Sequence, residues 1–445
     1  MGSDSLYRRL YESYGLAVGM CRDTTFIDQA NLDKDCFPIL PFLKNAYRKA
    51  VDEASMGYGP AGGGLGLLKV RKYENLLVDE SSIYSALSMG GAGGALEANL
   101  RALKEKTGRN RVIIPTPCYP IFQEIALQNG LTVDSCMGQP ERGFLPDIEE
   151  VIGWMQSSTL GIIIANPGNP ACVHYSQEDL ERLEQACVDN HSYLIVDSIF
   201  EETNHSGSFT SVLSFLNSHN VVKIKSPSKD RAGLNDLRLG YSSTRDLDLF
   251  NKIRWVGAYR DCSIPHVQEA VLVADIDGRI AMLDAKGDMQ DFEDSGLNDY
   301  ISQVFEFKQK YIAGVMEVYG FLKEKGVRVI KPEAGNILLF QLDTNNDMDF
   351  VKECAEKRKV GLTAGSVFGL PQHEGWFRIT VSSEPQKIIG GLERAIELSA
   401  QPDKSNSYWS QRDSDSSIKA LQDFVLDSEI PLDLEQKFLS SDGCV

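Results

Sequence analysis

The sequence lacks closely spaced cysteine pairs and long apolar runs. Its nine cysteines are scattered over 445 residues without a CxxC pair. This spacing predicts reduced thiols in a cytoplasmic protein, with no disulfide framework, and we expect no metal site. No segment approaches the roughly 18 apolar residues that cross a membrane. The first residues carry charges throughout and lack the apolar core of a signal peptide. The expected location is therefore the cytoplasm.

Basic residues are few compared with acidic ones. The chain has 45 Lys and Arg against 63 Asp and Glu, a formal net charge of -18. This balance argues against nucleic acid or an anionic membrane as a partner. Residues 1–30 are too few for a DNA-binding module. No strand–GxGxxG–helix unit with a following acid is present, which argues against a nucleotide-dependent dehydrogenase. A small-molecule substrate is the remaining expectation.

The middle of the chain alternates short apolar runs with amphipathic segments. The runs are aliphatic or β-branched and predict buried strands: residues 111–115, 160–165, 192–196 and 221–225. Segments between them, such as residues 177–190, predict helices. This alternation predicts an α/β fold, with a mostly parallel sheet and helices on both faces. Ligands of such sheets lie beyond the carboxyl ends of the strands, so we expect the chemistry in those loops.

The composition divides the chain into four expected parts. Residues 46–305 contain the strand–helix alternation and predict a large domain. Residues 306–400 have fewer, more separated strands, which favours a smaller α+β domain. Residues 1–45 are expected to form an N-terminal arm and part of the small domain. Residues 401–445 are acidic and begin with a stretch rich in Pro, Asp, Ser and Asn, which predicts a mostly flexible tail.

Two glycine-rich segments are candidates for an anion site. Residues 88–96, SMGGAGGAL, precede a predicted helix, where the backbone N–H groups of Ala92 and Gly93 are placed to hold a phosphate. A flexible turn is the alternative. Residues 62–66, GGGLG, are a weaker candidate, because no strand precedes them as a nucleotide-binding fold requires.

A lysine lies among hydroxyl groups in residues 226–241, SPSKDRAGLNDLRLGY. An amine that forms an imine needs a closed site, and a phosphate beside it needs hydroxyl and guanidinium donors. Lys229, with Ser226 before it and Arg238 after it, supplies both chemistries. The pattern resembles the lysine box of the class I/II aminotransferase family, fold-type I enzymes that bind pyridoxal phosphate to the lysine as a Schiff base. A solvated loop with ordinary charges is the alternative.

Two predicted strand ends carry further resemblances to this family. Asn169 lies in Asn-Pro-Gly-Asn-Pro, residues 166–170, which resembles the family's NPxNP turn. The resemblance assigns Asn169 to the cofactor's phenolic oxygen and to substrate binding, and a structural turn is the alternative. Asp197 resembles the aspartate that keeps the cofactor's ring nitrogen protonated, so that the ring accepts electrons from the substrate's α-carbon.

Three more residues follow the family's order along the chain. Tyr119 follows a predicted strand, as does the aromatic residue that stacks on the cofactor ring. Tyr58 resembles the tyrosine that reaches the phosphate of the neighbouring subunit's cofactor, which implies a homodimer with shared sites; an exposed turn tyrosine is the alternative. Arg378 is a cation within an apolar strand, and its fork fits an α-carboxylate. An internal salt bridge is the alternative. The resemblance covers most of residues 25–400.

The resemblance implies a pyridoxal-phosphate-dependent enzyme that acts on an α-amino acid. Lys229 would hold the cofactor and then remove the Cα proton of the substrate. Asp197 would stabilise the resulting carbanion, and Arg378 would hold the substrate carboxylate. The residues that would anchor the phosphate supply hydroxyl, guanidinium and backbone donors: Ser226, Arg238, Ala92 and Gly93.

Three departures from the family pattern leave the reaction open. Phe200 stands where the family has a tyrosine that donates to the phenolic oxygen. Ala171 and Cys172 replace the usual Thr-Gly. One extra residue separates Lys229 from the arginine of the lysine box. An aminotransferase is the expectation; elimination, replacement or cyclisation, for example on S-adenosylmethionine or a modified arginine, is the alternative.

Overall fold

A seven-stranded sheet forms the centre of the computed structural model, which describes residues 25–27, 32–54, 57–284 and 295–400. Its strand order is β2-β8-β7-β6-β5-β3-β4. The strands are β2 (Tyr84–Met89), β3 (Arg111–Ile113), β4 (Thr132–Asp134), β5 (Thr159–Ala165), β6 (Tyr193–Asp197), β7 (Val221–Lys225) and β8 (Leu239–Thr244). The neighbours from β7 to β4 are parallel. The predicted α/β fold with a mostly parallel sheet is therefore confirmed.

The strand β8 is antiparallel to both of its neighbours, β2 and β7. It begins directly after Arg238, so the lysine box folds as a loop between two adjacent strands of the same sheet. The apolar runs of the sequence predicted β3, β5, β6 and β7 at nearly their observed bounds. They did not predict β8, whose small and polar residues Ser242, Ser243 and Thr244 are all buried.

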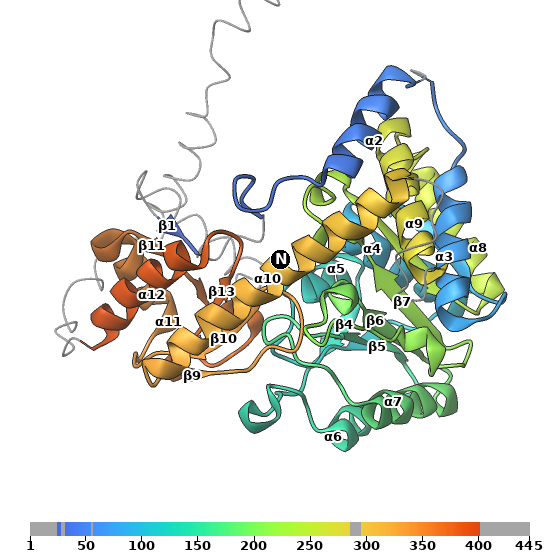
Figure 1. Cartoon of the computed structure of the whole chain (residues 1–445). Helices are drawn as coiled ribbons and strands as arrows, with labels where there is room; N and C mark the ends of the chain where they lie inside the picture. The colour runs from blue at the N-terminus through green and yellow to red at the C-terminus, as the bar shows by residue number, and fades with distance from the viewer. Residues whose placement is uncertain (1–24, 28–31, 55–56, 285–294, 401–445) are drawn as a thin grey trace, which may run out of the picture.

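Helices cover both faces of this sheet (Figure 1). One face packs against α4 (Gly91–Thr107), α5 (Ile121–Gln128) and α8 (Leu247–Asp261) in one apolar cluster. The opposite face packs against α6 (Ile148–Gly153) and α7 (Gln177–Asp189). A third cluster joins β2 and β8 to α2 (Pro41–Asp52), α3 (Leu65–Val78), α9 (His266–Asp284) and α10 (Ser295–Glu324). Among the described helices, none combines the length and apolar character needed to cross a membrane.

A second, four-stranded sheet is built mainly from the last part of the described chain. Its order is β12-β13-β10-β9, and its strands are β9 (Arg328–Val329), β10 (Ile337–Gln341), β12 (Thr363–Ala364) and β13 (Trp376–Thr380). It packs with α11 (Asp347–Glu353) and α12 (Pro385–Ser399) in its own core. The long helix α10 runs from the large sheet's helices to this part (Figure 1).

The N-terminal strand β1 (Thr25–Phe26) pairs with β11 (Val360–Gly361), beside the small sheet. This pairing agrees with an N-terminal segment that belongs to the small domain, and the domain boundaries stay a prediction. The predicted tail, residues 401–445, lies outside the described residues.

Candidate active site

Lys229 lies just beyond the carboxyl end of β7, in the short helix η4 (Pro227–Lys229). The preceding Ser226 shapes this turn: its hydroxyl donates to the Leu239 carbonyl (2.8 Å) and accepts from the Ser228 N–H (3.3 Å). Burial and, to a smaller extent, the cations of Arg378 and Arg238 lower the pKa of Lys229 to about 8. About a tenth of the amine is therefore neutral at pH 7, and about half at pH 8.

The glycine-rich loop and Arg238 together form an anion cradle. The α4 helix begins at Gly91, whose N–H donates to the Arg238 carbonyl (2.9 Å), and the Arg238 guanidinium donates to the Gly90 carbonyl (3.0 Å). A Cβ on Gly240 would lie 2.2 Å from the Gly91 carbonyl oxygen and 2.9 Å from the Ala92 nitrogen, so only glycine permits this approach. A helix N-terminus beside a guanidinium favours a phosphate.

The ends of β5 and β6 bring Asn169 and Asp197 to the same edge of the sheet. Ala165 pairs with Asp197 in the parallel ladder, and the Asn166 N–H donates to the Asp197 carbonyl (2.9 Å). The Asp197 carboxylate accepts from the Ile199 N–H (3.0 Å). Burial raises the pKa of Asp197 to about 7. A cationic partner such as a protonated ring nitrogen would favour its charged form.

Tyr119 and Arg378 approach this edge from two other elements. The loop that holds Tyr119 is tied to the small sheet's side, because the Cys118 N–H donates to the Phe368 carbonyl (3.0 Å). The Arg378 guanidinium lies over the Phe368 ring, 4.9 Å from its centre, and contacts Thr363. Burial raises the pKa of Tyr119, while the Arg378 cation lowers it and the Asp197 anion raises it. These mutual effects place the three side chains around one space.

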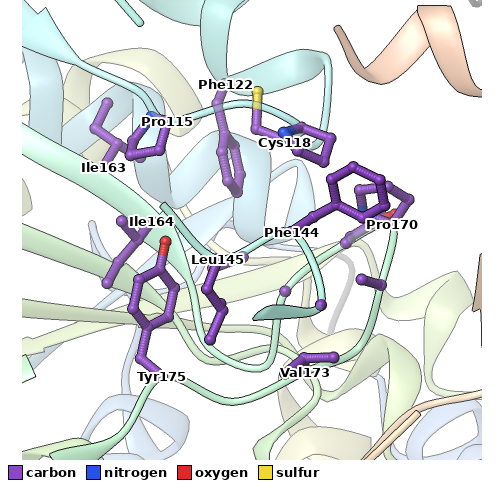
Figure 2. Close-up of a pocket in the computed structure, with 16 residues that line it drawn as sticks. Pro115, Cys118, Phe122, Phe144, Leu145, Ile163, Ile164, Pro170, Val173 and Tyr175 are labelled. Carbon is purple, nitrogen blue, oxygen red and sulfur yellow. The ribbon is translucent and has the colours of Figure 1, made fainter. Parts of the chain in front are cut away.

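An apolar pocket lies behind the turn that carries Asn169 (Figure 2). Phe122, Phe144 and Pro170 line it together with Asn169, and no Lys, Arg, Asp or Glu is among its sixteen lining residues. The Oδ1 atom of Asn169 is buried and accepts no hydrogen bond from the described residues. This pocket does not suit a phosphate, because no cation lines it.

The donor set fits pyridoxal phosphate. A half-buried amine of lowered pKa, a buried carboxylate, an aromatic ring and an anion cradle match the aldehyde, ring nitrogen, ring face and phosphate of that molecule. Ser226 lies at the cradle, but its hydroxyl hydrogen is directed to a backbone carbonyl. Ser228, which is partly exposed, is a second hydroxyl beside Lys229 that sequence reasoning did not assign.

Two sequence candidates lie apart from this constellation. Tyr58 is 93% exposed in the single chain. The second glycine-rich segment holds an anion of the chain itself: Glu269 accepts from the N–H groups of Gly64 (2.6 Å) and Gly66 (2.9 Å) at the start of α3. That segment is therefore a carboxylate-capped helix start and not a second phosphate site.

The loop between Lys229 and Arg238, which is one residue longer than in the family pattern, packs against the N-terminal part of the chain. Gly233 has a φ of 87°, accepts a hydrogen bond from the Tyr47 hydroxyl (3.0 Å) and lies against Ile39.

Sequence reasoning missed a set of buried charged residues beneath Lys229. Lys223 and Lys225 lie on one face of β7 and are fully buried, where they meet Glu201 and Glu202 after β6. Two lysines spaced two apart in an otherwise apolar strand were the available signal, because burial of such a strand forces both ammonium groups to find anions.

Comparisons with known proteins agree with this geometry. The family described as aminotransferase class I and II matches residues 77–394. An aspartate aminotransferase of Thermotoga maritima is 25% identical over 289 residues, which are 64% of this chain and 68% of that protein. Nicotianamine aminotransferase B of Hordeum vulgare is 25% identical over 382 residues, 82% of this chain and 65% of that protein.

A solved structure shows the same fold. The crystal structure of the Thermotoga maritima aspartate aminotransferase matches with a TM-score of 0.74 at 20% identity, over 89% of this chain and 97% of that one. The fold is therefore that of the fold-type I aminotransferases.

Proposed function

The chain belongs to the class I and II aminotransferase family, whose members use pyridoxal phosphate, and we propose that it transfers the amino group of an α-amino acid to a keto acid at the site around Lys229. The main support is the position of Lys229 directly after β7, in the same loop as Arg238, whose guanidinium and carbonyl bond the glycine-rich start of α4. The lowered pKa of Lys229 agrees with this role. A lysine of this kind serves as the imine-forming amine and, when neutral, as a general base.

Each site residue has one proposed task. When bound, pyridoxal phosphate supplies an aldehyde and an electron-accepting ring. Lys229 binds the aldehyde and takes the Cα proton of the substrate. Asp197 would hold the proton on the ring nitrogen, Asn169 would bind the phenolic oxygen, and Tyr119 would lie against the ring. The phosphate would be held by the Arg238 guanidinium and the backbone donors of Ala92 and Gly93. The Ser226 hydroxyl would join them by turning from the Leu239 carbonyl to the phosphate.

Arg378 defines the substrate class in this proposal. Its buried guanidinium, on β13, lowers the pKa of both Lys229 and Tyr119. The guanidinium therefore lies near the reacting amine. A guanidinium binds a carboxylate through two parallel hydrogen bonds. The substrate is therefore an α-amino acid whose carboxylate lies on Arg378, with its amine toward Lys229.

A homodimer in the cytoplasm completes the proposal. Large apolar side chains are exposed on the single chain: Tyr58, Leu68, Trp255 and Tyr259, at 62–93% exposure. A second copy that covers them would bring the partner's Tyr58 toward the cradle. The cysteines in the described part of the chain form no disulfide, which agrees with a cytoplasmic location.

A product assay tests the reaction. The purified protein, loaded with pyridoxal phosphate, is incubated with a panel of amino acids and a keto-acid acceptor, and the products are separated. Transamination yields one keto acid for each new amino acid formed. Release of ammonia or of an unsaturated product, with no new amino acid, would contradict the proposal and support elimination. Lys229→Ala is the control and should form neither product.

A further inference from the structure

A buried ion cluster lies between the segments that carry Lys229 and Asp197. Its members are charged side chains that are each at most 3% exposed: Glu74, Glu201, Glu202, Lys223, Lys225, Asp230, Arg231, Asp275 and Arg279. Burying an ion costs several kcal/mol, and a buried pair often stabilises a fold no more than apolar residues would. Nine such residues below a reacting lysine therefore need a reason other than stability.

Lys225 joins the two reacting segments within this cluster. Its ammonium lies 3.0 Å from the Asp230 carboxylate, and Asp230 directly follows Lys229. The same ammonium lies 3.6 Å from Glu201 and 3.6 Å from Glu202, which follow Asp197 on the neighbouring segment. Lys225 thus holds the segment after β7 to the segment after β6.

Glu201 is held in the same place from the other side. Its carboxylate lies 2.6 Å from the Lys223 ammonium, which in turn pairs with Glu74 (3.1 Å). The two lysines of β7 therefore fix Glu201 close to the strand end where Asp197 stands. A backbone hydrogen bond also joins the ends of β6 and β7, because the Ser198 N–H donates to the Ile224 carbonyl (2.8 Å).

Lys225 and Glu201 act on Asp197 with opposite sign. Burial raises the pKa of Asp197 to about 7, the Ile199 N–H and the Lys225 ammonium lower it, and the Glu201 carboxylate raises it. Tyr119, from the loop after β3, is the other titratable group that Asp197 affects. Beyond burial and the Ile199 hydrogen bond, the charge of Asp197 near neutral pH therefore depends on two charged neighbours with opposite effects, Lys225 and Glu201.

We propose that Lys225 and Glu201 are positioning residues that set the charge of Asp197 toward the cofactor's ring nitrogen and hold it in register with Lys229. This proposal rests on the proposed function, because Asp197 needs its negative charge only if a protonated ring binds beside it. The two residues act as a matched pair, one favouring the carboxylate and the other the carboxylic acid.

The test is the pH dependence of pyridoxal phosphate binding to the cofactor-free protein. In the wild-type protein two groups titrate near neutral pH, Lys229 with a pKa of about 8 and Asp197 with a pKa of about 7. The variants should move the lower midpoint, that of Asp197, and leave the Lys229 midpoint in place. Lys225→Met removes the favourable cation and should raise the Asp197 midpoint by about one pH unit, so that binding at pH 6 weakens roughly tenfold. Glu201→Gln removes the opposing anion and should lower the midpoint, so that binding at pH 6 tightens roughly fivefold.

Opposite shifts separate this role from structural damage. Each variant breaks buried ion pairs, and damage alone would weaken binding at every pH with the midpoint unmoved. A pyridoxal phosphate analogue with carbon in place of the ring nitrogen is the second control, and its affinity should not follow the midpoint shifts. If Lys225→Met does not fold, the double variant Lys225→Met/Asp230→Asn is tested in its place. The double variant removes one charge of each sign from the cluster.

The results distinguish a failure of cofactor binding from a failure of the role of Lys225 and Glu201. A wild-type protein that does not bind pyridoxal phosphate would refute the proposed function. A wild-type protein that binds it, with variants whose midpoints stay equal or move in the same direction, would refute the role of Lys225 and Glu201 alone.

Discussion

Cys172 and Phe200 pack together against the backbone of Gly335. Both side chains are buried, at 0% and 2% exposure, in one cluster with Ile337. A Cβ on Gly335 would lie 2.8 Å from the Cys172 sulfur and 3.0 Å from the Phe200 ring. Two of the sequence's departures from the family pattern are thus one packing unit. Cys172 has a φ of 52°, a conformation that costs a non-glycine residue about 1–2 kcal/mol, which its burial offsets.

Phe200→Tyr tests what the missing hydroxyl does. Because Phe200 has no hydroxyl to donate, the cofactor's phenolic oxygen is more basic. The imine nitrogen beside this oxygen therefore keeps its proton up to a higher pH. A tyrosine hydroxyl would stabilise the anionic oxygen. The pH midpoint of the bound cofactor's visible absorbance should therefore fall by about one unit. Phe250→Tyr, the same change in the cluster below α8, is the control and should leave the midpoint unmoved. A low wild-type midpoint that Phe200→Tyr does not change would disprove this explanation.

Arg378→Lys tests the carboxylate-binding role. The lysine keeps the charge but loses the two parallel hydrogen bonds, which are worth roughly 2–3 kcal/mol in a buried site. We expect kcat/KM for the best amino acid to fall about 50-fold, with most of the change in KM. Cofactor affinity should change less than threefold.

Arg328→Lys is the matched control for that variant. Arg328 is half exposed on β9, where it pairs with Glu141 at the surface (3.5 Å). It should show wild-type kinetics. An equal loss of kcat and no change of KM in Arg378→Lys would instead indicate a role in the chemical step.

The sequence predicted the strand ends of the site better than their surroundings. Lys229, Asp197 and Asn169 follow apolar runs that could form only buried strands, so their common edge was foreseeable. Lys225 was not assigned, because a lysine at the end of an apolar run looks like an exposed strand end until β8 covers it. Its partner Asp230 lies in the loop after β7. Glu201 lies after β6, and only the folded chain brings it to Lys225.

Glu269→Ala tests the assignment of the second glycine-rich segment. The carboxylate accepts from two N–H groups at the start of α3, so its loss leaves both without an acceptor. The free energy of unfolding should fall by about 1–3 kcal/mol. Cofactor affinity should stay unchanged, because the phosphate cradle is the other glycine loop. Glu269→Gln, which keeps one acceptor oxygen, should lose less stability. A large loss of cofactor affinity with unchanged stability would show that the segment does bind phosphate.

Lys229→Met should stabilise the cofactor-free protein at neutral pH. The pKa of Lys229 is about 8 in the fold and 10.5 in an unfolded chain. Between these values the unfolded state binds more protons, so the wild-type stability contributed by this group rises with pH and is lowest below pH 8. The variant should therefore be more stable below pH 8, by about 1–2 kcal/mol given the partial exposure of the side chain.

The check is urea unfolding of both proteins from pH 7 to pH 10. The stability difference should shrink as the pH rises through this range. A difference that does not depend on pH would mean that the Lys229 amine is not desolvated.

The most direct measurement is to trap the cofactor on the protein. The protein is incubated with pyridoxal phosphate, reduced with borohydride, digested and examined by mass spectrometry. The account predicts one modified peptide, with the label on Lys229, and loss of the visible absorbance in Lys229→Ala. A label on Lys225 or on surface lysines alone, or a Lys229→Ala variant that keeps the absorbance, would contradict the assignment of Lys229.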